Sequence, residues 1–142
     1  MTTAAFALSD EQRKEIIALL IDFIKQRLEL GRTTSYSELK GFLITRDETR
    51  TAEGKPELLP HGTVDLFHEG NRQLADCLRE ADARIAATTG IEDATVIVWL
   101  LDSNWPADGY FADRHLDDYA PKARHVYAAQ HVARVFAEWK HR

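Results

Sequence analysis

The chain has 142 residues, of which 44% are hydrophobic and 29% charged, and its formal net charge is −5. These values are typical of one soluble domain, 1–142, that is large enough to bury a core without disulfides. No apolar run approaches the roughly 20 residues that span a bilayer, and the amino-terminal residues lack the positive segment of a signal peptide. Cys77 is the one cysteine. This excludes an intrachain disulfide and a cysteine-based zinc site, so we expect a cytoplasmic protein.

Charge is distributed unevenly along the chain. Residues 63–112 carry 3 Lys or Arg against 9 Asp or Glu, a net charge of −6. Residues 113–142 have a net charge of +2 and hold four of the six histidines. A segment as acidic as 63–112 repels a phosphate backbone and attracts a basic partner. The ordinary alternative is a solvated acidic face without a partner.

The first helix is predicted over 10–30. Ser9-Asp10-Glu11-Gln12 fits a capping box that follows a flexible tail, 1–8, and Gly31 is the expected carboxyl-terminal cap. The apolar residues recur at spacings of three and four. They form one stripe that should face the core and consists of Ile16, Ile17, Leu20, Phe23, Ile24 and Leu28.

A second capping box, 35–38, predicts a short helix over 36–44, which a glycine inside it weakens. The polar stretch 45–62 has no apolar period and reads as a loop. Such a loop is longer than compact domains usually contain, so it is either functional or merely mobile. Leu58 and Leu59 are its two candidate anchors on the core.

Two further helices are predicted. The first has helical period from Val64 to Thr88, with 71–88 as its main part because Gly70 and Asn71 interrupt the first turns, and it ends at Gly90. The second runs from Pro121 to the carboxyl terminus. The apolar stripe of the first consists of Phe67, Leu74, Cys77, Leu78, Ala81 and Ile85. The stripe of the second consists of Val126, Ala129, Val132, Ala133, Val135, Phe136 and Trp139.

The clearest strand signal lies at 94–101, where a run of β-branched, aromatic and leucine residues has no charge. Both faces of this strand should therefore be covered. Turn residues and Pro106 follow, and Gly109 precedes Tyr110 and Phe111, which predicts a turn and a short return strand. The expected fold class is α+β, mostly helical and winged-helix-like. A β-hairpin or small sheet near 94–111 would be the wing, and a carboxyl-terminal helix would follow it.

The sequence 34–39, Thr-Ser-Tyr-Ser-Glu-Leu, is followed by Ile97-Val98 and by Pro-x-x-Gly-Tyr-Phe at 106–111. This pattern resembles small bacterial winged-helix-like domains of unsettled function. The outline is also loosely similar to the alkylguanine DNA alkyltransferase domain, which has Pro-Cys-His-Arg in its active-site segment. This chain has Thr-Val-Ile-Val at 95–98 instead, so the resemblance does not imply alkyl transfer.

No motif predicts catalysis or cofactor binding. His125 and His131 diverge around a helix, and His115 with Asp117 has no third ligand, so no metal site is expected. Cys77 is expected to be a buried, unreactive thiol. Because nucleophile elbows and glycine-rich nucleotide loops are also absent from the sequence, we expect no cofactor and a protein that is not an enzyme.

These observations favour a non-enzymatic inhibitor of the immunity or antitoxin type, which would neutralise a basic partner such as a nuclease toxin. Acidic residues and two aromatic anchors form the predicted partner-binding site: Asp76, Glu80, Asp102, Asp108, Trp105 and Tyr110. Whether Trp105 and Phe111 belong to the core or to the interface stays open.

The alternative is a winged-helix protein that binds nucleic acid. The segments that usually contact DNA in that fold, the third helix and the wing, are acidic here. Binding would therefore use a carboxyl-terminal basic face made of Lys122, Arg124, Arg134, Lys140 and Arg142. The identity of the partner and the oligomeric state are not predicted.

Overall fold

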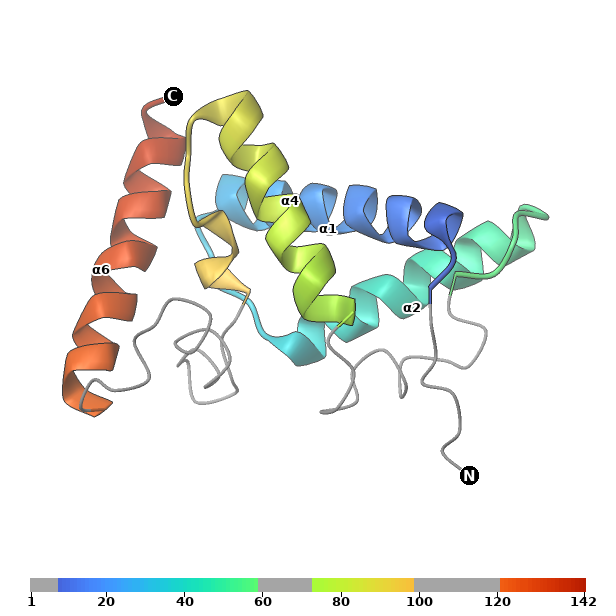
Figure 1. Ribbon diagram of the computed structural model, residues 1–142, viewed down its shortest axis with the longest axis horizontal. Coiled ribbons are helices and arrows are strands. Elements are labelled where there is room, and N and C mark those ends of the chain that lie inside the picture. The colour runs from blue at the N-terminus through green and yellow to red at the C-terminus, as the bar shows by residue number, and fades with distance from the viewer. Residues whose placement is uncertain (1–7, 59–72, 99–120) are drawn as a thin grey trace.

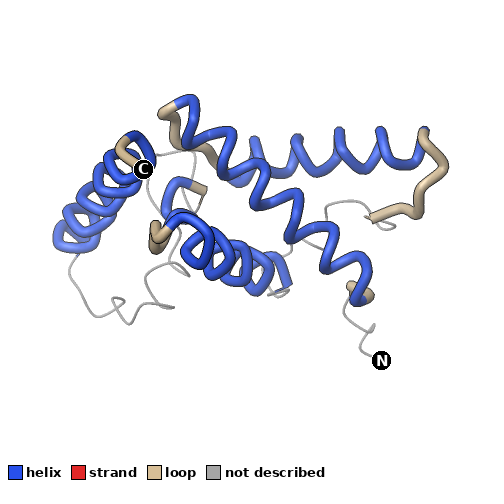
Figure 2. The backbone as a smooth tube through the Cα atoms, turned by 90° about the horizontal axis from the view of Figure 1, so that it is seen from above, coloured by secondary structure: helices blue, strands red, loops and turns tan. Residues whose placement is uncertain are grey.

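The computed structural model describes residues 8–58, 73–98 and 121–142. Helices make up 79% of these residues, in four α-helices and one 3₁₀ turn, with no strand among the described ranges (Figure 1). Figure 2 shows from above that the remaining described segments are connecting loops. The predicted α+β, winged-helix-like class is therefore wrong, and the described part of the chain is an all-helical fold.

α1 (Asp10–Leu30) forms as predicted and contacts α2, α4 and α6. The Ser9 hydroxyl accepts from the Gln12 N–H at 3.1 Å, and the Gln12 side chain accepts from the Ser9 N–H at 2.9 Å. These two bonds complete the capping box. Gly31 ends the helix at φ 65°. All six residues of the predicted stripe are buried, so the apolar period correctly identified the core side of this helix.

α2 (Tyr36–Ala52) begins where predicted but does not end at residue 44. Its first half buries Leu39 and Leu43, and it packs against α1. The Ser35 hydroxyl accepts from the Glu38 N–H at 3.3 Å. Burying the apolar pair and capping the first turn offset the cost of the glycine inside the helix, about 1 kcal/mol. The predicted boundary at residue 44 was therefore wrong.

The second half of α2 makes polar contacts. Arg50 donates to Glu15 of α1 at 3.3 Å, and Asp47 accepts from the Leu58 N–H at 2.6 Å. Leu58 is 3% exposed, which confirms it as an anchor, whereas Leu59 lies outside the described residues. The loop predicted at 45–62 is thus helical as far as residue 52, because ion pairs and hydrogen bonds replace the apolar period there.

α4 (Gln73–Thr89) matches the predicted helix at 71–88 in its described part, and Gly90 follows it at φ 77°. The residues that it buries, against α1 and the 3₁₀ turn, are Leu74, Cys77, Leu78, Ala81 and Ile85. Phe67 lies outside the described residues. The predicted stripe is confirmed for the five residues that the structure describes.

The 3₁₀ turn η1 (Ala94–Ile97) stands where the strand was predicted. Its four residues and Val98 are each at most 1% exposed, so the expectation that this run is covered on all sides is confirmed here. η1 packs between α4 and α6 and also contacts α1 (Figure 1). The remainder of the predicted hairpin, 99–111, lies outside the described residues.

Hydrogen bonds with a helix and a loop satisfy polar groups of η1. In a strand, the backbone groups would need a neighbouring strand instead. Asp82 of α4 accepts from the Thr95 N–H at 3.2 Å and from its hydroxyl at 3.1 Å. The Ile97 carbonyl accepts from the Thr34 N–H at 2.9 Å. Asp93 precedes η1 at φ 61°, a left-handed conformation that interrupts an extended chain. A short apolar run does not distinguish a buried strand from a buried helical turn, which explains the wrong prediction.

α6 (Pro121–Lys140) begins at Pro121 as predicted and packs on η1 and α1. Its buried side consists of Ala128, Val135 and Trp139, with Val132 and Phe136 partly buried. The residues of the predicted stripe that are exposed instead are Val126, Ala129 and Ala133. The buried stripe is therefore narrower than the sequence suggests. None of the described helices is long and apolar enough to cross a membrane.

Candidate functional site

The exposed side of α4 carries the two predicted partner-binding residues that the structure describes, Asp76 and Glu80. Asp76 forms an ion pair with Arg79, and Glu80 forms one with Arg84 at 3.2 Å. The two acidic side chains keep 47% and 41% of their surface exposed, and the arginine side chains keep 44% and 51%. Pairs of this kind contribute only about 0.3–0.5 kcal/mol each, so both carboxylates can change partners at small cost.

Two small residues, Ala83 and Ala87, are also exposed on α4. Residues three and four apart share one face of a helix, so these alanines lie beside the ion pairs. We call this surface the α4 face, and it consists of Asp76, Arg79, Glu80, Ala83, Arg84 and Ala87. It combines charged side chains in weak ion pairs with two small side chains that allow another molecule to approach the helix closely.

The other predicted site residues, Asp102, Trp105, Asp108 and Tyr110, lie outside the described residues. Whether they lie near the α4 face stays a prediction. Asp82 belongs to the same acidic segment, but it faces η1 and holds Thr95. The net charge of the segment therefore overstates the number of acids that can meet a partner.

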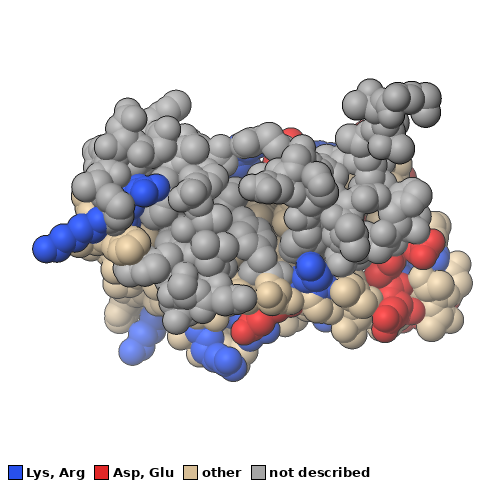
Figure 3. Space-filling view, turned by 90° about the horizontal axis from the view of Figure 1, so that it is seen from below, with Lys and Arg blue, Asp and Glu red and all other residues tan. Residues whose placement is uncertain are grey.

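A further group of exposed acids lies where α1 begins and α2 ends. Gln12 donates to the Glu57 carbonyl at 3.3 Å, which holds the segment after α2 beside the start of α1. We call this group the α1–α2 acidic end, and it consists of Asp10, Glu11, Glu48, Glu53 and Glu57. Figure 3 shows acidic side chains gathered at this end of the lower face and basic side chains toward the opposite end, where α6 lies.

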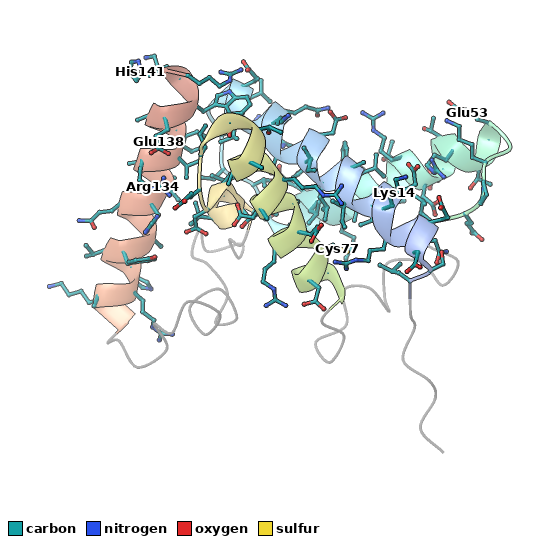
Figure 4. The ribbon with its side chains drawn as sticks, turned by 45° about the horizontal axis from the view of Figure 1, so that its top comes forward. Lys14, Glu53, Cys77, Arg134, Glu138 and His141 are labelled. Carbon is teal, nitrogen blue, oxygen red and sulfur yellow. The ribbon has the colours of Figure 1, made fainter. Side chains whose placement is uncertain are left out.

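The α1–α2 acidic end was not predicted, because the loop assigned to 45–62 concealed the second half of α2. Figure 4 shows Glu53 at this end, on the same side of the molecule as Lys14 of α1. The composition of 45–52 gave little signal, because Arg46, Glu48 and Arg50 favour a helix while three threonines and an aspartate in the same stretch do not.

The carboxyl-terminal basic residues are partly engaged within the protein. Arg142 donates to Glu29 of α1 at 2.7 Å, and its guanidinium carbon lies 3.7 Å from the centroid of the Trp139 ring. The Trp139 indole N–H donates to the same carboxylate at 3.1 Å. Lys122 and Lys140 are exposed on α6, but 18 residues separate them, which is about 27 Å along a helix. The proposed basic face is therefore not a compact patch.

Cys77 lies on α4 and is fully buried (Figure 4). Burial raises the pKa of its thiol, and the Arg13 guanidinium, whose nitrogen lies 3.7 Å from Sγ, offsets part of that effect. The neighbouring carboxylates Asp76 and Glu80 act in the same direction as burial. A buried thiol with a raised pKa is a poor nucleophile, in agreement with its assignment to the core.

Side chains from α6 and from the segment before η1 form a third polar cluster. His131 Nδ1 lies 3.6 Å from Asp93 Oδ2 and 3.2 Å from an Arg134 nitrogen. Arg134 also donates to Glu138 and to the Glu92 carbonyl, each at 2.7 Å. The described residues contain no group of three His, Cys, Asp or Glu side chains placed to hold a metal ion.

No protein-family model matches the chain, and neither a characterised protein nor a solved structure gives a match. The chemistry of the described residues is therefore the basis for any assignment of function. Among the described residues, the α4 face presents two partly exposed carboxylates whose partners lie on the same helix. The α1–α2 acidic end also has such a pair, between Glu53 and Lys55.

Proposed function

We propose that the protein is a non-enzymatic inhibitor that binds a basic protein, as immunity proteins and antitoxins bind nuclease toxins. The observation that carries the proposal is the exposure of Asp76 and Glu80 on the α4 face, where arginines of the same helix pair with them. The net charge of −6 over residues 63–112 adds a field that attracts a basic molecule.

Binding would exchange the internal ion pairs for contacts with the partner. Arg84 is about half exposed and pairs with Glu80 on its own helix, so it can swing into solvent while a cationic group of the partner takes its place. A pair that becomes desolvated in an interface couples more strongly than one that faces water. Ala83 and Ala87 leave room for the partner's backbone to approach. Trp105 and Tyr110 remain the proposed aromatic anchors of the same interface.

Nucleic-acid binding through the carboxyl-terminal basic face is the weaker candidate. Arg134 and Arg142 make contacts with other parts of the protein, and the two exposed lysines of α6 are far apart. A protein that neutralises several phosphates with clustered cations shows a steep dependence of duplex affinity on salt. We expect no such dependence here.

The first test is capture of the partner followed by an activity assay. The tagged full chain is incubated with lysate of the native host at low and high salt, with nuclease added. We expect a basic protein to be retained after nuclease treatment. The purified partner should then lose its own activity in a saturable manner as the protein is added.

Two results would contradict the proposal. One is recovery of nucleic acid alone, lost at high salt, which would favour the nucleic-acid candidate. The other is a captured basic protein whose activity is unchanged by saturating amounts of this chain.

A further inference from the structure

The polar cluster between α6 and the start of η1 contains a histidine with two competing neighbours. His131 Nδ1 lies 3.2 Å from an Arg134 nitrogen and 3.6 Å from Asp93 Oδ2. Its ring also packs against Tyr127, with 4.2 Å between the ring centroids. About 25% of the His131 side chain is exposed, so it can exchange protons directly with water.

The two neighbours require opposite states of the same nitrogen. A guanidinium is only a donor, so Arg134 can bond to Nδ1 only when that nitrogen carries a lone pair. A carboxylate is only an acceptor, so Asp93 can bond to Nδ1 only when that nitrogen carries a proton. Nδ1 can therefore accept from Arg134 when the ring is neutral with its proton on Nε2, and can donate to Asp93 when the ring is protonated.

We propose that His131 is a pH-sensitive contact between α6 and the segment before η1, accepting from Arg134 when neutral and donating to Asp93 when protonated. The proton comes from solvent. Histidine is the side chain that ordinarily changes charge near neutral pH, so the exchange of partners falls in an accessible range.

Among the described residues, the charged and titratable groups near the ring come from the segment before η1 and from α6. The segment before η1 contributes Asp93 and Glu92, and η1 itself contains no titratable residue. α6 contributes Tyr127, Arg134 and Glu138. The positive charge of Arg134 opposes protonation of the ring. The ion pair between Arg134 and Glu138, at 2.7 Å, partly neutralises that charge.

Protonation strengthens the attachment of α6. Arg134 keeps its bonds to the Glu92 carbonyl and to Glu138 in both states, and the imidazolium adds an ion pair to Asp93. The added contact forms as the pH falls and is lost as the pH rises. This inference does not depend on the proposed inhibitor function.

The test is nuclear magnetic resonance of the histidine side chains in the full chain. Long-range proton–nitrogen spectra recorded between about pH 5 and pH 8 report the protonation of each ring nitrogen. At high pH we expect His131 to carry its proton on Nε2, and at low pH on both nitrogens. Amide exchange in the first half of α6, corrected for its intrinsic pH dependence, should slow on acidification.

Asp93→Asn removes the charge and keeps a residue that tolerates the left-handed backbone. It should lower the proton affinity of His131 about threefold or more, as expected for loss of an ion pair at this distance. It should also abolish the change in amide exchange. Asp93→Gly, which accepts φ 61° without strain, should have the same effect. Equal proton affinity of His131 in wild type and both variants would overturn the proposal, as would a neutral ring protonated on Nδ1.

Discussion

α4 and α6 both expose charged side chains, but they use them differently. On α4, Asp76 and Glu80 pair with arginines one turn away on the same helix. On α6, Arg134 reaches the carbonyl of Glu92, and Arg142, just beyond the helix, reaches Glu29 of α1. The Glu80–Arg84 pair lies within one helix and can separate without breaking a contact between elements, whereas Arg134 and Arg142 each bridge two elements. The comparison explains why the acidic α4 face, rather than the basic α6, is proposed to meet a partner.

The largest loss of stability is expected from a substitution at the contact between α6 and α1. Trp139 is 6% exposed and donates to Glu29, so Trp139→Ala should lower the free energy of unfolding by about 3–5 kcal/mol. Urea denaturation followed by circular dichroism measures this. Trp139→Phe, which keeps most of the apolar volume and loses the N–H, should cost clearly less. A loss below about 1 kcal/mol for the alanine variant would show that α6 is not held by this contact.

A smaller loss of stability is expected from a substitution on the side of α4 that faces η1. Asp82→Ala removes the acceptor of the Thr95 N–H and hydroxyl, in a residue that is 1% exposed. Leaving these groups unsatisfied should cost about 1–3 kcal/mol. Asp76→Ala, on the exposed side of the same helix, is the matched control and should stay within about 0.5 kcal/mol. Equal losses in both variants would remove the distinction between structural and available acids on α4.

The pH dependence of stability tests whether the Cys77 thiol is buried on α4. Its pKa is raised in the folded protein, so the folded state holds the thiol proton more tightly than the unfolded chain does. This contribution to stability is complete below the pKa of an unfolded thiol, about 8.5, and is lost as the pH rises through the folded value. Between about pH 7.5 and pH 9.5, the wild type should therefore lose more stability than Cys77→Ala. Parallel pH profiles for the two proteins would indicate a solvated thiol.

The sequence predicted the helices wherever caps and apolar period agreed. For α1, a capping box, a continuous stripe and a terminal glycine identify the same boundaries. The second half of α2 was missed because Asp47 and Arg50 hold it in place of apolar residues. η1 was predicted as a strand because a β-branched, apolar composition indicates that a segment is buried but not whether it is extended or helical. The contacts with Asp82 and Thr34 that hold η1 as a 3₁₀ turn come from distant parts of the chain.

The candidate site was predictable in part. An exposed Asp76 and Glu80 follow from the helical period of α4, because both lie away from its apolar stripe. Their pairing with Arg79 and Arg84 also follows from spacings of three and four. The acids gathered at the α1–α2 acidic end could not be predicted in the same way, since they meet only when the segment after α2 folds back on α1.

The most direct measurement is a binding titration of the captured basic partner against two charge-reversal variants. Asp76→Lys with Glu80→Lys changes the α4 face, and Glu48→Lys with Glu57→Lys makes the same change in net charge at the α1–α2 acidic end. The first variant should weaken binding by more than about tenfold, or 1.4 kcal/mol, because contacts in the interface are lost. The second should have a smaller effect, confined to long-range attraction and removed by salt. Equal weakening by both variants, or none by the first, would contradict binding through the α4 face.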